Sequence, residues 1–76
     1  MKNIIEFYYN IKIDTLHNKN DYYFFSINNR NFILKPYYND ERTASNSYQL
    51  SSILSERINI DNIIPNKYNS PITIIE

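Results

Sequence analysis

The chain has 76 residues, enough for one small domain with a modest core, since 42% of them are hydrophobic. Eight basic and eight acidic residues cancel to a formal net charge of zero, so the charge indicates neither a nucleic-acid partner nor an acidic tail. The absence of cysteine excludes disulfides and thiolate metal sites. No apolar run approaches the roughly 20 residues of a membrane span, and no signal-peptide pattern follows Met1. We therefore expect a soluble, cytoplasmic protein without a membrane partner.

Residues 3–9 (NIIEFYY) fit either a short helix or a first strand, because their apolar pattern is compatible with both. The following segments are typical of strands. Residues 10–16 alternate apolar and polar side chains, residues 22–27 (YYFFSI) are mainly aromatic, and residues 31–38 (NFILKPYY) begin with an apolar run. Short polar turns separate these segments, so we expect an antiparallel meander of three strands.

The chain contains no glycine, so its turns must use other residues. Asparagine is the best substitute, because it adopts positive φ more readily than other residues that carry a Cβ atom. On this basis we expect turns at residues 17–21 (HNKND) and 28–31 (NNRN). Pro36 cannot donate a backbone hydrogen bond to a sheet, so it should mark the end or the edge of its strand.

The segment 40–58 is expected to form the main helix. Asn39 or Asp40 can cap its N-terminus, and Glu41 in the first turn suits the helix dipole. Its apolar residues recur at roughly helical spacing: Ala44, Tyr48, Leu50, Ile53, Leu54 and Ile58. The serines between them are mediocre helix formers, so packing must hold this helix.

A loop at 59–62 and a final strand at 71–76, which pairs back onto the sheet, complete the expected chain. The expected fold class is α+β in a single domain, residues 1–76. It has a small antiparallel sheet in the order β-β-β-α-β, with one main helix packed on one face.

Lys35 is the residue most suggestive of function. It follows Phe32, Ile33 and Leu34, so its strand has at least one buried face. A lysine in this setting can extend to the sheet edge and keep its ammonium group in water, which is a purely structural role. Its position near the end of a strand also allows it to meet an anionic ligand.

Three segments resemble the N-terminal lobe of a kinase-like fold: Phe32-Ile33-Leu34-Lys35, SYQLSSIL (47–54) and INIDNIIP (58–65). More narrowly, the chain is similar to spore-coat kinase-like proteins, relatives of the aminoglycoside and choline phosphotransferases. The resemblance implies that Lys35 contacts the phosphates of ATP, bound with Mg²⁺, and pairs with a helix carboxylate. Glu41 lies in the first turn of the expected helix and Glu56 near its end, while Gln49 could hydrogen-bond Lys35 without neutralising it.

The chain departs from that family in two ways. A phosphate-covering loop uses glycines so that its backbone can approach the ligand, and the turn at 17–21 has none. The catalytic-loop aspartate and the metal-binding aspartate of such kinases belong to a C-terminal lobe that is not present. We therefore assign no catalytic residue and no metal ligand, and we expect no phosphotransferase activity from this chain alone.

Other chemistry-bearing residues have simpler interpretations. His17 is the single histidine; in a polar turn it is expected to be solvated, and no cysteine or second histidine can complete a metal site around it. Residues 22–25 (YYFF) suit core and interface packing better than stacking on nucleic-acid bases, because the local charge is weak. We therefore expect no nucleic-acid partner.

Two functions remain open. In the first, the chain is a kinase-like N-terminal lobe, fragment or remnant (a pseudokinase, spore-associated by resemblance) that binds a partner lobe or a second copy and with it a nucleotide. In the second, it is an independent α+β adaptor that recognises a peptide or protein along a helix–strand groove or a sheet edge. The orientation of Lys35 separates them: a cleft favours the first, and an exposed edge the second.

Overall fold

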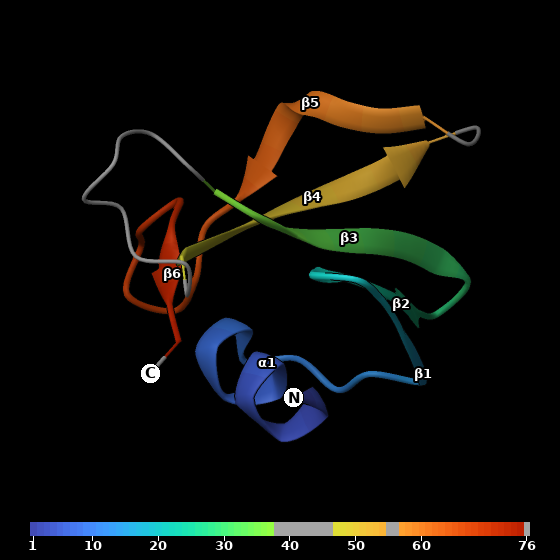
Figure 1. Ribbon diagram of the computed structural model, residues 1–76, viewed down its shortest axis with the longest axis horizontal. Helices are drawn as coiled ribbons and strands as arrows, with labels where there is room; N and C mark the ends of the chain where they lie inside the picture. Colours follow the sequence, from blue (N-terminus) through green and yellow to red (C-terminus); the bar gives the residue numbers. More distant parts are fainter. Residues whose placement is uncertain (38–46, 55–56, 76) are drawn as a thin grey trace.

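The computed structural model describes residues 1–37, 47–54 and 57–75 of the chain. One helix and six strands follow one another along these residues: α1 (Lys2–Tyr9), β1 (Thr15–Lys19), β2 (Tyr22–Ile27), β3 (Arg30–Pro36), β4 (Ser47–Leu54), β5 (Arg57–Ile64) and β6 (Thr73–Ile74). The helix lies against one face of an antiparallel sheet (Figure 1). The expected α+β class is thus confirmed.

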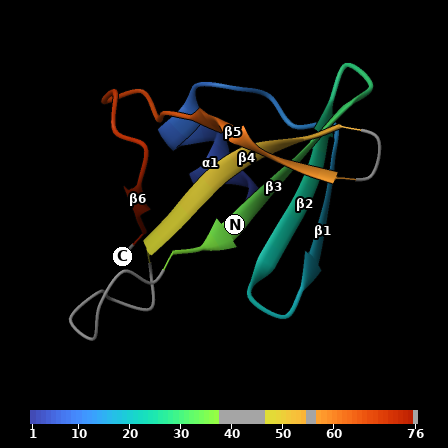
Figure 2. The same ribbon diagram turned by 90° about the horizontal axis from the view of Figure 1, so that it is seen from above.

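The sheet is a meander in which β1 to β5 lie side by side in chain order, each antiparallel to the next. The expected antiparallel arrangement of the first three strands is confirmed. β6 also pairs with β4, at Ser47 and Tyr48, whereas β5 pairs with β4 from Leu50 onward. β5 and β6 therefore pair with different stretches of β4, and residues 65–72 connect the two strands (Figure 2).

Asparagine takes the backbone conformations that glycine usually supplies, as expected. Asn28 and Asn29 join β2 to β3 with φ of 49° and 67°, and two consecutive positive φ angles match the twist of a tight hairpin. Asn20, with φ of 57°, lies in the turn between β1 and β2. Asn10 ends α1 in the left-handed region, and its N–H donates to the Glu6 carbonyl.

The core lies between α1 and one face of the sheet. Ile5 and Tyr9 of α1 are buried in a cluster with Phe25 of β2, Leu34 of β3 and Leu50 of β4. Residues 5 and 9 are four apart, so both side chains leave the helix on the side that meets the sheet. The segment 3–9, which fitted a helix or a strand, is a helix because its apolar side chains cover this face.

The loop 65–72 is organised by the buried side chain of Asn66. Its Nδ2 donates to the Ile72 carbonyl at 3.3 Å and to Thr73 Oγ1 at 3.0 Å, and its Oδ1 accepts the Tyr68 and Ser70 N–H groups at 2.9 and 3.2 Å. Thr73 Oγ1 lies in turn 2.7 Å from Tyr9 Oη. Burial raises the pKa of the Tyr9 phenol, and the hydrogen bond to Thr73 acts in the opposite direction.

The helix expected at 40–58 is wrong wherever the structure describes that segment. Residues 47–54 form β4, and Arg57 begins β5. The cap candidates Asn39 and Asp40 lie outside the described residues. Pairing with β3 prevails over the helical spacing of the apolar residues, because it satisfies the β4 backbone from Tyr48 to Ile53 while placing Leu50 in the core.

Several other boundaries also differ from expectation. β1 starts at Thr15 and runs to Lys19. Asp14, just before it, donates its N–H to the Ser26 carbonyl at 2.9 Å, and its carboxylate accepts the Asn28 N–H at 3.0 Å. Residues 59–62 lie within β5 rather than in a loop, although pairing with β4 is irregular between Ile58 and Ile63. The final strand contains only Thr73 and Ile74. Pro36 ends β3, as its missing donor predicts.

Candidate functional site

The sheet has a second face, opposite α1, which we call the open face. Side chains alternate along a strand, so the residues that do not point to the core point here. The open face consists of Thr15, His17 and Lys19 of β1, Tyr22, Phe24 and Ser26 of β2, Asn31, Ile33 and Lys35 of β3, and Gln49, Ser51 and Ile53 of β4. No helix or strand of the described residues crosses it (Figures 1 and 2).

Strand register arranges these side chains in three rows across the sheet. The first row contains Lys19 opposite Tyr22 and Lys35 opposite Gln49. The second row contains His17, Phe24, Ile33 and Ser51. The third row contains Thr15, Ser26, Asn31 and Ile53. None of the side chains in these rows is acidic, so the open face combines aromatic, neutral polar and basic groups.

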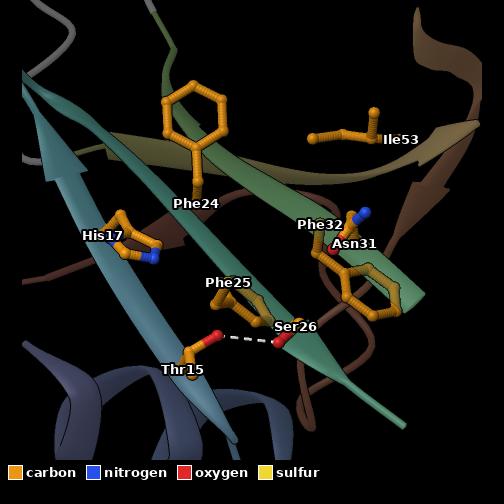
Figure 3. Close-up of a pocket in the computed structure, with 8 residues that line it drawn as sticks. All are labelled: Thr15, His17, Phe24, Phe25, Ser26, Asn31, Phe32 and Ile53. Carbon is orange, nitrogen blue, oxygen red and sulfur yellow. Dashed lines mark hydrogen bonds between the residues drawn. The ribbon is translucent and has the colours of Figure 1, made fainter. Parts of the chain in front are cut away.

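A hollow of about 340 Å³ lies over the second and third rows (Figure 3). Its walls are mostly open-face side chains, with Phe25 and Phe32 also bordering it: Thr15, His17, Phe24, Phe25, Ser26, Asn31, Phe32 and Ile53. Thr15 Oγ1 and Ser26 Oγ are 2.8 Å apart and satisfy each other. This volume is at the lower end of the range of small-molecule sites, roughly 300–1,000 Å³. The hollow therefore suits a ring-sized group.

Aromatic stacking continues from the hollow toward the first row. The Tyr22 and Phe24 rings are stacked at 6.5 Å between centroids, with an interplanar angle of 16°. Tyr22 lies opposite Lys19 on β1. On β3, the other neighbour of β2, Leu34 is opposite Tyr23. The same register places Lys35 of β3 beside Tyr22. A ring flanked by two lysines thus adjoins an aromatic-lined hollow.

Two of the three expected ligand-contacting residues come together in the structure. Lys35 and Gln49 are Cα partners on β3 and β4, and both side chains are half-buried. Gln49 stands opposite Lys35 on a neighbouring strand and not on a helix, which corrects the expected helix–strand pairing. Glu41 and Glu56 lie outside the described residues, and no ion pair to Lys35 occurs within the described part of the chain.

Sequence reasoning missed two features of this face. His17 is exposed, as expected, but it stands on β1 and borders the hollow instead of lying in a turn. Ser51 is fully buried between Ile33 and Ile63, and its hydroxyl has no hydrogen-bond partner among the described residues. No pattern in the sequence distinguishes Ser51 from its neighbour Ser52, because only the strand register decides which of the two is enclosed.

Within the described ranges, no group of three or more histidine and carboxylate side chains is placed to hold a metal ion. Likewise, α1 is too short to cross a membrane, and no other helix occurs in the described part. Comparison of the chain with protein-family models, with curated proteins and with solved structures found no match.

Proposed function

We propose that this chain is a nucleotide-binding lobe of kinase-like type, non-catalytic by itself, with the open face as its binding surface. The observation that carries the proposal is the placement of Lys35. Its half-buried side chain lies on the face of the sheet opposite α1, without an ion pair among the described residues, one row from Phe24 in the wall of the aromatic-lined hollow. An uncompensated ammonium group near a ring-sized hollow suits a ligand that combines a planar ring with an anionic group.

The dimensions of the open face support such a ligand. Asn31 borders the hollow, and Lys35 lies four residues further along the same strand. Because a strand rises about 3.3 Å per residue, roughly 13 Å separates the two positions. A base can then occupy the hollow beside Phe24 and Asn31, while its phosphates extend toward Lys35 and Lys19.

The geometry also indicates what this face does not supply. The partner of Lys35 on β4 is the neutral amide Gln49, and no acidic side chain stands in the three rows. Phosphoryl transfer depends on carboxylates that hold Mg²⁺ and orient the attacking group. Those groups would have to come from a partner lobe, so we propose binding and not catalysis for this chain.

Isothermal titration with ATP, with and without Mg²⁺, tests the proposal. We expect Lys35→Ala to weaken binding at least tenfold, because it removes the cation proposed to meet the phosphates. Lys2→Ala is the matched control, since Lys2 is an exposed lysine on α1 across the sheet. Equal affinity of wild type and Lys35→Ala, or no binding by wild type at millimolar ATP, would refute the proposal.

A peptide-binding adaptor is the second candidate, supported by a specific feature of the sheet. β1 is an outer strand of the described sheet, and four of its five residues are exposed. An exposed edge can accept an extended peptide as an additional strand. Hydrogen exchange separates the candidates: a strand-adding peptide protects the outward amides of β1, whereas a nucleotide on the open face leaves them unprotected.

A further inference from the structure

Helix α1 carries more apolar surface than the core uses. Ile5 and Tyr9 are buried, whereas Ile4 and Phe7 are three residues apart on another side of the helix and are 38% and 56% exposed. A helix that packs on one sheet buries a single stripe of side chains. The second apolar side of α1 is therefore available to something other than this sheet.

The loop 65–72 extends that surface. The Lys67 N–H donates to the Tyr8 carbonyl at 2.7 Å and fixes the loop beside the helix. The Tyr68 ring meets the Tyr8 ring edge-on at 6.4 Å, and Tyr8 meets Phe7 edge-on at 5.4 Å. We call Ile4, Phe7, Tyr8, Lys67 and Tyr68 the aromatic patch.

Lys67 gives the aromatic patch a positive centre. Its Nζ lies 3.2 Å from the Phe7 ring centroid and 5.4 Å from that of Tyr68. Rings that face a cation in this way hold it in place without neutralising its charge. The nearby acidic residue on α1, Glu6, is already used, because its Oε2 accepts the Ile13 N–H at 2.8 Å. No described carboxylate forms an ion pair with Lys67.

We propose that the aromatic patch docks a partner-protein segment in which an aspartate or glutamate adjoins an aromatic or large aliphatic residue. The apolar residue would cover Phe7 and Tyr68, which is 65% exposed, and the carboxylate would pair with Lys67. Aromatic side chains around a charged group are typical of residues that dominate binding energy in interfaces. A second copy of the chain fits less well, because a twofold contact would bring two Lys67 ammonium groups together.

This surface is separate from the open face. α1 packs on the sheet face that carries Leu34, and its strand neighbour Lys35 points to the other face, so the two surfaces can be occupied together. The inference therefore does not depend on nucleotide binding.

Selection from a phage-displayed library of random dodecapeptides tests the inference on the whole chain. We expect the selected peptides to contain an acidic residue next to an aromatic or aliphatic one. Synthetic copies of them should bind at least tenfold more weakly to Phe7→Ala and to Lys67→Ala, and with unchanged affinity to Lys35→Ala. Phe7 and Lys67 are exposed and Lys35 is half-buried, and circular dichroism checks that each variant keeps the wild-type fold.

Charge reversal makes the test specific for the partner chemistry. Lys67→Glu should lose the acidic peptides and select basic ones from the same library. Selected peptides that lack acidic residues, or that bind Phe7→Ala and Lys67→Ala as tightly as wild type, would overturn the inference. So would a dimer in sedimentation velocity that Phe7→Ala converts to a monomer, since the patch would then be occupied by a second copy.

Discussion

The Tyr9 and Thr73 hydroxyl oxygens lie 2.7 Å apart in the core, although 64 residues separate them in the chain. This hydrogen bond joins the helix at the start of the chain to the last strand, and Asn66 connects the same threonine to the loop 65–72. The side chains of Tyr9, Thr73 and Asn66 form one hydrogen-bonded group. This group fixes the loop that carries Lys67 and Tyr68. These three side chains contribute to the stability of the fold, whereas ligand binding on the open face does not depend on them.

Tyr9→Phe is expected to lower the free energy of unfolding by about 1 kcal/mol, the usual net value of a buried hydrogen bond. Thr73→Val is expected to cost about 2 kcal/mol, because it also removes the bond from Asn66 Nδ2. The double variant should lose less than the sum, because both changes remove the same bond. Urea denaturation monitored by circular dichroism measures all three. Tyr22→Phe is the control: the Tyr22 hydroxyl forms no hydrogen bond with the described residues and its side chain is exposed, so stability should not change. Strictly additive losses would contradict a direct bond.

Tyr9 also predicts an alkaline limit to stability. Its pKa is raised in the folded state above the ordinary value of 10.0, mainly by burial. The folded state therefore holds the proton to higher pH than the unfolded state does. Stability from this group is fully present below pH 10 and falls as the pH rises through the folded-state pKa. Unfolding free energies measured between pH 8 and about 11 should fall less steeply in Tyr9→Phe, and equal slopes would oppose this assignment.

Ser51→Ala is expected to stabilise the protein by about 1 kcal/mol, because it removes a buried hydroxyl that has no partner in the described part of the chain. Ser52→Ala provides a matched comparison on the next residue. The Ser52 hydroxyl accepts a hydrogen bond from Asn62 Nδ2 at 3.3 Å, so its loss should be neutral or slightly destabilising. Thermal unfolding of the two variants decides the point. A Ser51→Ala variant less stable than wild type would show that the hydroxyl has a partner in solution.

Asn66→Ala should cost about 2 kcal/mol or more, since the side chain serves four hydrogen bonds in and beside the loop. Amide resonances of residues 67–73 should shift in the NMR spectrum, while those of the β2–β3 turn should not. Asn69→Gly is the control, because Asn69 has φ of 65°, which glycine adopts without strain. If both variants lose equal stability, the loop is held by its backbone and not by Asn66.

Short-range features of the fold could be read from the sequence. The β2–β3 hairpin follows from two β-prone runs joined by Asn28 and Asn29, which accept positive φ, and Pro36 ends β3 because it has no N–H. Lys35 was recognisable as a candidate from its type and its place in an apolar strand. Each of these features depends on residues within one strand or turn of each other.

Tertiary pairing decided the rest. The spacing of Leu50, Ile53 and Leu54 fits a helix, and the segment became β4 because β3 on one edge, and β5 and β6 on the other, pair with its backbone. The same register placed Gln49 opposite Lys35, enclosed Ser51 and assembled His17, Phe24 and Asn31 around one hollow. The sequence by itself thus determined the local hairpin, its asparagine turns and the candidate lysine. The sheet order, the site around Lys35 and the aromatic patch depend on contacts between distant segments, which local propensity does not encode.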